Sequence, residues 1–161
     1  MITCMFEDNG EAKLRHVVVD TIVLNEDNQI LLVKRALHTL EGGKYALVGG
    51  YVDRNESIRH TVEREILEET GYTSKIDYLL RIKDNPDRPN DNERQNIAFV
   101  FVAHAIEKVG KPDNESTEQT WFNLDNLPPK DQIAFDHYND IEVFLKSRDN
   151  PSACNHLVSI T

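Results

Sequence analysis

Residues 50–72, GYVDRNESIRHTVEREILEETGY, constrain the fold of this chain more than any other stretch. Their local features are those of a helix. Asn55 is a suitable N-cap, and Glu56 would place a negative charge in the first turn, where the helix dipole favours it. Gly71 suits a left-handed C-terminal cap, because it has no Cβ. We therefore predict a helix over about residues 56–70.

One face of this helix is apolar and the adjoining face is acidic. The apolar stripe consists of Ile58, Val62 and Ile66, and the acidic arc consists of Glu65, Glu68 and Glu69. Like charges three and four residues apart repel each other, so the helix gains from this arrangement only if a cation lies between them. Carboxylate oxygens on a short arc suit Mg²⁺ or Mn²⁺, which prefer oxygen ligands. The alternative for an arbitrary acidic helix is a solvated surface.

The spacing of the fixed residues in this stretch favours the metal site over the solvated surface. The pattern resembles the Nudix box of the Nudix hydrolases, G-x5-E-x7-R-E-U-x-E-E-x-G-U, in which U is an aliphatic residue. Each fixed polar or glycine position is matched, and the one departure is Tyr72 in the last aliphatic position. The resemblance implies an α/β protein with the Nudix fold, in which a mixed β-sheet is sandwiched between helices.

The same resemblance implies roles for the residues of the box. Glu65, Glu68 and Glu69 would hold the metal together with the backbone carbonyl of Gly50. Arg64 lies four residues before Glu68, so an ion pair could orient that carboxylate. On an ordinary surface helix such a pair would contribute less than about 1 kcal/mol.

Two further carboxylates are candidates for the same site. Glu56 is either a simple first-turn charge or, by the resemblance, a supporting carboxylate of the metal site. Many Nudix enzymes take another carboxylate from the loop before a late strand, as metal ligand or general base. Glu118, three residues before Trp121, is our preferred candidate over Glu115, and solvation in a loop is the alternative for both.

The segments before the box predict a hairpin and a glycine-rich approach to the site. Residues 14–24 are predicted to form one long strand, followed by a turn at 25–28 and a second strand at 29–35. Arg35 ends that strand and could contact phosphate or ribose, or simply be exposed. Gly49 and Gly50 permit backbone angles that would turn a carbonyl toward a metal.

The segments after the box predict two strands joined by a long polar loop. The strands cover residues 74–82 and 97–106, the second being almost entirely apolar and therefore central. The loop between them is long for a compact domain and is a candidate substrate-binding flap. Arg88 and Arg94 could contact phosphate there, although most charged loop residues are simply solvated.

The C-terminal third predicts a short strand at 120–124, a break at Pro128 and Pro129, and a helix over about 131–146. The Phe-Asp-His triplet at 135–137, which follows a Leu-Pro pair, resembles the closing helix of the Nudix branch that includes ADP-ribose pyrophosphatases. We expect one domain over residues 1–161, with its core at about 14–146. Whether residues 150–161 are ordered stays open.

Composition and charge exclude several other classes of protein. The net charge is −10 without an offsetting basic run, so a nucleic-acid groove is not expected. The six histidines are scattered singly, which disfavours zinc. Cys4 and Cys154 form neither a disulfide framework nor a metal motif. No signal peptide or membrane span is predicted, so we expect a cytoplasmic location.

These features together predict a Mg²⁺-dependent or Mn²⁺-dependent hydrolase of a nucleotide. The expected reaction is cleavage of the diphosphate linkage in a nucleoside diphosphate joined to another group, with ADP-ribose or a related dinucleotide favoured. One alternative is hydrolysis of normal or oxidised nucleoside triphosphates to monophosphates. Another is a Nudix domain that binds a nucleotide without cleaving it, against which the complete carboxylate set argues. A homodimer is possible, because the sequence does not separate interface from core.

Overall fold

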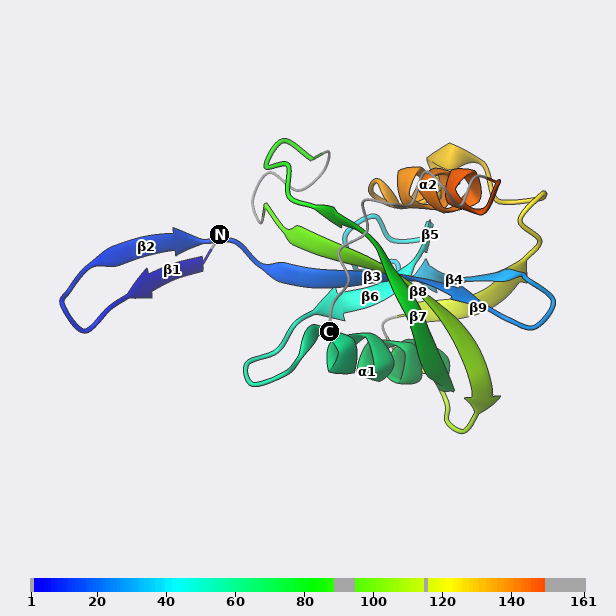
Figure 1. Cartoon of the computed structure of the whole chain (residues 1–161), viewed down its shortest axis with the longest axis horizontal. Coiled ribbons are helices and arrows are strands. Elements are labelled where there is room, and N and C mark those ends of the chain that lie inside the picture. Colours follow the sequence, from blue (N-terminus) through cyan, green and yellow to red (C-terminus); the bar gives the residue numbers. More distant parts are fainter. Residues whose placement is uncertain (1, 89–94, 115, 150–161) are drawn as a thin grey trace.

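The computed structural model describes residues 2–88, 95–114 and 116–149. A mixed β-sheet lies between two helices, α1 on one face and α2 on the other (Figure 1). This arrangement confirms the predicted α/β/α architecture. The helices are α1 (Ile58–Thr70) and α2 (His137–Asp149), and the strands of this sheet are β3 (Val17–Leu24), β4 (Ile30–Arg35), β5 (Tyr45–Ala46), β6 (Val48–Tyr51), β7 (Tyr72–Lys83), β8 (Ile97–Lys108) and β9 (Ser116–Phe122).

Strand β3 organises the sheet. The order along the main path is β5-β4-β3-β8-β7, with β6 also paired to β3 and β9 paired to β4. Strands β3 and β8 are parallel, whereas the other pairs in this sheet are antiparallel, which makes the sheet mixed. As the sequence predicts, β8 is central, since it lies between β3 and β7 and residues 100–103 are buried. The predicted hairpin also forms, with Leu24 opposite Ile30 across the turn.

Side chains of β3 alternate between the two faces of the sheet, so each face has its own core. Val19 and Val23 pack in a cluster that includes Val62 and Ile66 of α1. Ile22 and Leu24, which flank Val23, face the opposite side of the sheet, where they pack in a second cluster that includes Ile141 and Phe144 of α2. Because α1 and α2 cover opposite faces, residues from both can meet only along an edge of the sheet.

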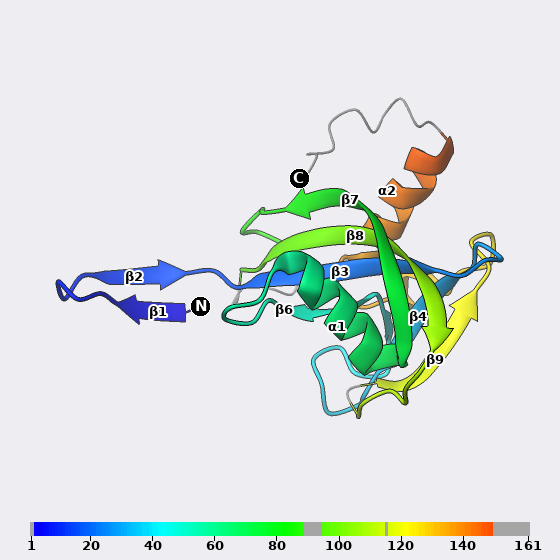
Figure 2. The same ribbon diagram turned by 60° about the horizontal axis from the view of Figure 1, so that its bottom comes forward.

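The prediction of one strand over residues 14–24 is wrong. Strand β2 (Glu11–Leu14) pairs only with β1 (Ile2–Met5), and this hairpin projects away from the main sheet (Figures 1 and 2). The break falls at Arg15 and His16, where the Arg15 side chain donates hydrogen bonds to the backbone carbonyls of Gln95 and Asn96. These contacts tie the chain to the start of β8, so that pairing with the main sheet begins only at Val17.

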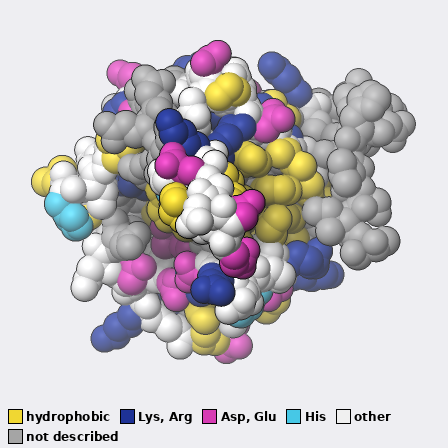
Figure 3. Space-filling view, turned by 90° about the vertical axis from the view of Figure 1, so that its left-hand side faces the viewer, with side chains coloured by type: hydrophobic (Ala, Val, Ile, Leu, Met, Phe, Trp, Pro, Cys, Tyr) yellow, Lys and Arg dark blue, Asp and Glu magenta, His cyan; other side chains and the backbone are white. Residues whose placement is uncertain are grey.

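The hairpin adds exposed apolar side chains to its side of the molecule. In Figure 3, hydrophobic side chains are visible on this face among acidic and basic ones. The exposed apolar residues of the hairpin are Ile2, Met5, Phe6 and Leu14. The possible homodimer stays a prediction.

The C-terminal helix begins later than the sequence indicates. After Pro129 the chain forms a short 3-10 helix, η1 (Lys130–Gln132), and then runs extended along β5, where the Ala134 N–H donates to the Tyr45 carbonyl at 2.7 Å. Phe135 has a φ of 55°. This left-handed residue interrupts the helical path, so that α2 starts only at His137. In the part of the chain that the structure describes, neither helix has the length and apolar character needed to cross a membrane.

Candidate active site

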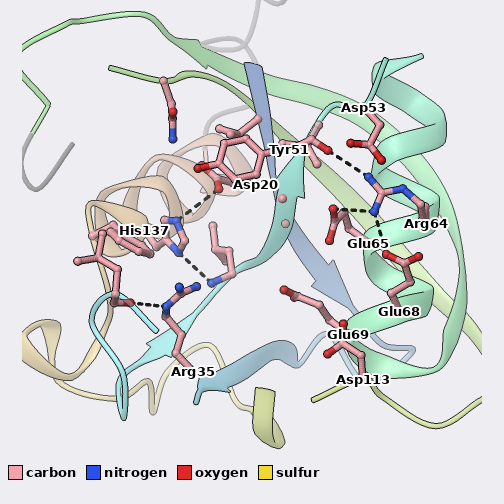
Figure 4. A pocket seen from close by; sticks show the side chains of 18 of the residues that line it. Asp20, Arg35, Tyr51, Asp53, Arg64, Glu65, Glu68, Glu69, Asp113 and His137 are labelled. Atoms are coloured by element: carbon pink, nitrogen blue, oxygen red, sulfur yellow. Dashed lines mark hydrogen bonds and ion pairs between the residues drawn. The ribbon is translucent and has the colours of Figure 1, made fainter. Parts of the chain in front are cut away.

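A pocket of about 330 Å³ lies beside β6, between the acidic face of α1 and residues from the opposite side of the sheet (Figure 4). Gly49 and Gly50 form part of its floor. Its other lining residues are Val18, Val19, Asp20, Arg35, Leu40, Leu47, Tyr51, Asp53, Arg64, Glu65, Glu68, Glu69, Arg88, Asn96, Asp113, Phe135 and His137. The predicted metal ligands therefore meet in one cavity.

Helix α1 supplies the acidic wall, and its ends are set by two caps. The prediction that Asn55 is the N-cap is wrong: Ser57 takes this role, and its hydroxyl accepts a hydrogen bond from the backbone N–H of His60 at 3.2 Å. Asn55 instead has a φ of 70° and lies in the turn before the helix. Gly71 is the left-handed C-cap, as predicted, and its N–H donates to the Leu67 carbonyl at 2.8 Å.

Arg64 connects the carboxylates of the box to one another. Its Nη1 lies 2.8 Å from carboxylate oxygens of both Glu65 and Glu68, and the second contact is the predicted i, i+4 pair. Its Nε donates to Glu56 at 2.9 Å, and its Nη2 donates to the Tyr51 carbonyl at 3.1 Å. One guanidinium thus holds three carboxylates and fixes the helix to β6.

Glu56 supports Arg64 from before the helix. Its side chain is only 7% exposed and also accepts a hydrogen bond from the Thr61 hydroxyl at 2.8 Å. The hydrogen bonds from Arg64 lower the pKa of Glu56 to about 2, against a smaller opposing effect of burial. Glu56 is therefore ionised at neutral pH, and it neutralises Arg64 without reaching into the pocket.

Glu69 is the most enclosed carboxylate of the acidic wall. It is 7% exposed and accepts a hydrogen bond from the Gly49 N–H, but its Oε2 is buried with no hydrogen-bond partner among the described residues. Burial raises its pKa well above the ordinary value, and the nearby charges of Glu65 and Asp113 add to this effect. A hard divalent cation would stabilise such a buried carboxylate oxygen, because it would supply the missing partner and offset the charge of the neighbouring carboxylates.

Gly50 lets the acidic wall approach the strand closely. A Cβ at this position would lie 2.2 Å from Oε1 of Glu65, so a larger residue would displace that carboxylate. Oxygen donors, negative charge and close packing together fit a Mg²⁺-type ion. In this conformation Arg64 holds Glu65 and Glu68, and within the described ranges no three acidic, His or Cys side chains already form a closed ligand cluster.

Asp113 is a pocket residue that sequence reasoning missed. It comes from the loop between β8 and β9, and its N–H donates to the Glu68 carbonyl at 2.8 Å. In the same loop, the Gly110 N–H donates to the Gly71 carbonyl at 3.0 Å. The loop is thus bound to the C-terminal end of α1 by backbone hydrogen bonds, which no local sequence pattern indicates.

Glu118 does not occupy the position predicted for it. It lies within β9 rather than in the preceding loop, and it is not among the residues that line the pocket. Its carboxylate accepts hydrogen bonds from Tyr45 and Thr120 and lies 3.7 Å from Lys34. The structure therefore does not support Glu118 as general base. Glu115, the other candidate, lies outside the described residues.

The three arginines predicted to contact substrate differ in their placement. Arg35 lines the pocket, with its Nε donating to the Leu40 carbonyl at 2.8 Å and its guanidinium 4.9 Å from the Phe135 ring centre. Arg88 also lines the pocket, but two of its nitrogens donate to Asp136 at 3.0 and 2.9 Å. Arg94 lies outside the described residues.

The wall opposite α1 contains a buried ionic cluster. Lys83 of β7 contacts Asp20 at 3.1 Å, Asp136 at 3.0 Å and Asp140 at 2.6 Å. Arg81 also pairs with Asp140, as Arg88 does with Asp136. The cluster joins β3, β7 and the start of α2 beneath the pocket. Sequence patterns did not indicate it, because its members are far apart along the chain.

His137 connects this cluster to the pocket surface. Its Nδ1 accepts a hydrogen bond from the Leu47 N–H at 3.0 Å, so the proton of the neutral ring is on Nε2, which lies 3.4 Å from Asp20 (Figure 4). Burial alone would raise the pKa of Asp20, but the nearby Lys83 and His137 outweigh it and lower the pKa. Asp20 is therefore an ionised acceptor at neutral pH.

Comparisons with known proteins agree with this geometry. A family model described as the NUDIX domain matches residues 14–142. The chain is 38% identical over 130 residues to an ADP-ribose pyrophosphatase of Methanocaldococcus jannaschii, which covers 81% of this chain and 73% of that protein. It is 42% identical over 107 residues to a Bacillus subtilis protein whose name provisionally assigns it as an 8-oxo-dGTP diphosphatase, covering 66% of each.

A solved structure shows the same fold. The crystal structure of a NUDIX hydrolase from Nitrosomonas europaea matches with a TM-score of 0.72 at 25% identity, covering 88% of this chain and 76% of that one. The family match spans the box, the sheet and the start of α2, and the acidic wall carries Arg64, Glu65, Glu68 and Glu69 of the box. The chain therefore belongs to the Nudix family, and it is a Nudix hydrolase.

Proposed function

We propose that this Nudix hydrolase cleaves the diphosphate linkage of a nucleoside diphosphate joined to another group, and that it requires Mg²⁺ or Mn²⁺. The observation that carries the proposal is the buried Oε2 of Glu69, which has no hydrogen-bond partner in the part of the chain that the structure describes and lies in a pocket lined by further carboxylates. ADP-ribose or a related dinucleotide is the preferred substrate. The similarity to the archaeal ADP-ribose pyrophosphatase supports this choice.

The metal would be held by the acidic wall and the strand facing it. Its ligands would be the carboxylates of Glu65, Glu68 and Glu69 and the carbonyl of Gly50. When bound, the ion would neutralise part of the diphosphate charge and make water a stronger acid. This contribution matters in a protein of net charge −10, because a diphosphate would otherwise be repelled from the pocket.

The protein's own residues would position the substrate and move the proton. Arg64 would orient the carboxylate of Glu68, which would take the proton of the attacking water. Because Glu68 is half-exposed, it can then release this proton to solvent. As the new bond from water oxygen to phosphorus forms, the bridging phosphorus–oxygen bond breaks and its electron pair leaves with the second phosphate. Asp113, next to Glu69 in the pocket, is the alternative proton acceptor. Arg35 would contact a phosphate oxygen.

A second candidate activity is hydrolysis of normal or oxidised nucleoside triphosphates to monophosphates. The similarity to the Bacillus subtilis protein favours it, because that alignment has the higher identity, although it covers less of the chain. The two activities would use the same carboxylates. They differ in the group attached to the nucleotide, and therefore in the products.

Product analysis separates these activities. The purified protein is incubated with ADP-ribose, other dinucleotides, sugar nucleotides and each (d)NTP, with and without about 5 mM Mg²⁺. We expect metal-dependent formation of AMP and ribose 5-phosphate from ADP-ribose. Cleavage of triphosphates alone would contradict the preferred substrate. Tight nucleotide binding without turnover of any compound would contradict the hydrolase assignment.

A further inference from the structure

Tyr51 lies at the point where the pocket passes from one face of the sheet to the other. In the antiparallel register of β3 and β6, Tyr51 is opposite Val18 and Gly50 is opposite Val19. Directly opposed residues point to the same face, and Val19 packs in the core under α1. Gly50 therefore faces the acidic wall, whereas Tyr51 faces the side of Asp20 and His137, as Figure 4 shows.

The ring of Tyr51 is held in place but remains accessible. Its carbonyl accepts a hydrogen bond from Arg64 at 3.1 Å, and its ring centre lies 5.3 Å from that of His16. The residue is nevertheless 41% exposed and lines the pocket. A fixed aromatic ring with accessible surface in a polar pocket is suited to stacking against a flat ring of the ligand.

The charges on this side of the pocket favour an uncharged ligand group. The three carboxylates of the buried cluster are balanced by three cations, Lys83, Arg81 and Arg88. The Nδ1 of His137 accepts the Leu47 N–H, so this nitrogen offers a phosphate no hydrogen-bond donor. Among the described residues, this cluster therefore leaves no net positive charge for a phosphate beside Tyr51, whereas Arg35 lies toward the other end of the pocket (Figure 4). The phosphates belong at the acidic wall with its metal, and the rest of the substrate belongs beside Tyr51.

We propose that Tyr51 binds the nucleobase of the substrate by stacking and is a specificity-determining residue of this enzyme. The inference rests on the proposed function, because it assigns the nucleoside end of that substrate. Gly50 and Tyr51 are neighbours that point to opposite faces of β6, so one strand serves both the diphosphate and the base. Asn96 also lines the pocket and carries an amide of the kind that donates to and accepts from a base edge.

Ligand binding without turnover tests this role. Calorimetry compares AMP with ribose 5-phosphate, which lacks the base, on the wild type and on Tyr51→Phe, Tyr51→Ala and Tyr78→Ala. Tyr78 is a matched control, since it is 37% exposed but lies on β7, away from the residues that line the pocket. We expect the wild type, Tyr51→Phe and Tyr78→Ala to bind AMP alike and more tightly than ribose 5-phosphate.

For Tyr51→Ala we expect AMP affinity to fall by about tenfold to hundredfold, with ribose 5-phosphate affinity unchanged. Equal AMP affinity in the wild type and Tyr51→Ala would overturn the proposal, as would an equal loss for both ligands. A spectroscopic check uses Tyr51→Trp, whose added emission should be quenched by AMP and not by ribose 5-phosphate. Quenching by both ligands, or by neither, would contradict stacking.

The result is separable from that of the hydrolase assay. Absence of ADP-ribose cleavage, together with a Tyr51-dependent preference for AMP, would contradict the proposed reaction and support the base site. Metal-dependent cleavage of ADP-ribose that is equally efficient in the wild type and Tyr51→Ala, with unchanged KM, would support the reaction and contradict the base site.

Discussion

At the scale of single residues, two glutamates of the box illustrate how position sets protonation. Glu56 accepts hydrogen bonds from Arg64, which lower its pKa to about 2. Glu69 is buried next to Glu65 and Asp113, and its pKa is raised. Glu56 is thus an ionised partner of Arg64, whereas Glu69 would need a bound cation to be ionised to the same extent.

The lowered pKa of Glu56 predicts a specific loss of stability in acid. A group whose pKa is lower in the folded state stabilises the fold above its unfolded pKa, and this contribution is lost as pH falls toward the folded value. For Glu56 that window runs from the ordinary value of 4.5 down to about 2. We therefore expect Glu56→Gln to be less stable than the wild type at neutral pH and to lose less stability on acidification.

Urea unfolding between about pH 6 and about pH 3 measures this difference. Glu63→Gln is the control, because Glu63 is an exposed glutamate on the same helix. Its unfolding free energy should follow that of the wild type at each pH. If Glu56→Gln and the wild type lost stability in parallel, the ion pair with Arg64 would not stabilise the fold as described.

At the scale of elements, the contact between the end of α1 and the loop from β8 to β9 brings Asp113 to the pocket. Gly71 has a φ of 76°, and a Cβ there would lie 2.3 Å from the Gly110 carbonyl oxygen. A Cβ on Gly110 would cause no such clash, since its nearest neighbour would be the Gly71 Cα at 3.7 Å. The two glycines therefore form a matched pair for mutation.

We expect Gly71→Ala to lower both stability and activity. The left-handed backbone alone costs about 1 kcal/mol, and the clash displaces the loop with Asp113. Turnover should fall by about tenfold to hundredfold, because small misplacements of catalytic groups are costly. Gly110→Ala should differ little from the wild type in steady-state kinetics and thermal unfolding. Similar losses in both variants would contradict the asymmetry of this contact.

The sequence predicted the elements of this site better than their assembly. The box located α1, its C-cap and the acidic arc, since these depend on residues within a few turns of each other. The start of α2 was placed too early, because the left-handed Phe135 is not visible in a hydrophobic pattern. Asp113 and the Lys83 cluster were missed for a related reason. A backbone hydrogen bond brings Asp113 to the pocket, and the register of β3, β8 and β7 brings Lys83 close to Asp20.

At the scale of the whole molecule, the pocket joins two halves that rest on opposite faces of the sheet. The α1 half carries unbalanced negative charge, and the α2 half carries a balanced ionic cluster. Lys83 is central to that cluster, since it contacts one aspartate from β3 and two from the region where α2 begins. Lys83 thus links α2 to the sheet, together with Arg81, Arg88 and the hydrophobic cluster on that face.

Replacing Lys83 by Met would leave buried carboxylates without their common partner. We expect the free energy of unfolding to fall by about 3–5 kcal/mol, the usual cost of breaking a buried ion pair from one side. Lys130→Met, at an exposed position in η1, is the control and should change stability by less than about 0.5 kcal/mol. Denaturant titration measures both, and equal stability of the two variants would rule out a structural role for the cluster.

We propose that catalysis depends on the carboxylates that α1 holds in the pocket. The most direct test is the turnover of ADP-ribose with Mg²⁺ by the wild type, Glu69→Gln and Glu118→Gln. Glu69 is buried in the pocket, whereas Glu118 lies on β9 and is not among the residues that line the pocket. We predict a loss of at least about hundredfold in kcat for Glu69→Gln and less than about twofold for Glu118→Gln. Near-normal turnover by Glu69→Gln would show that catalysis does not depend on this carboxylate.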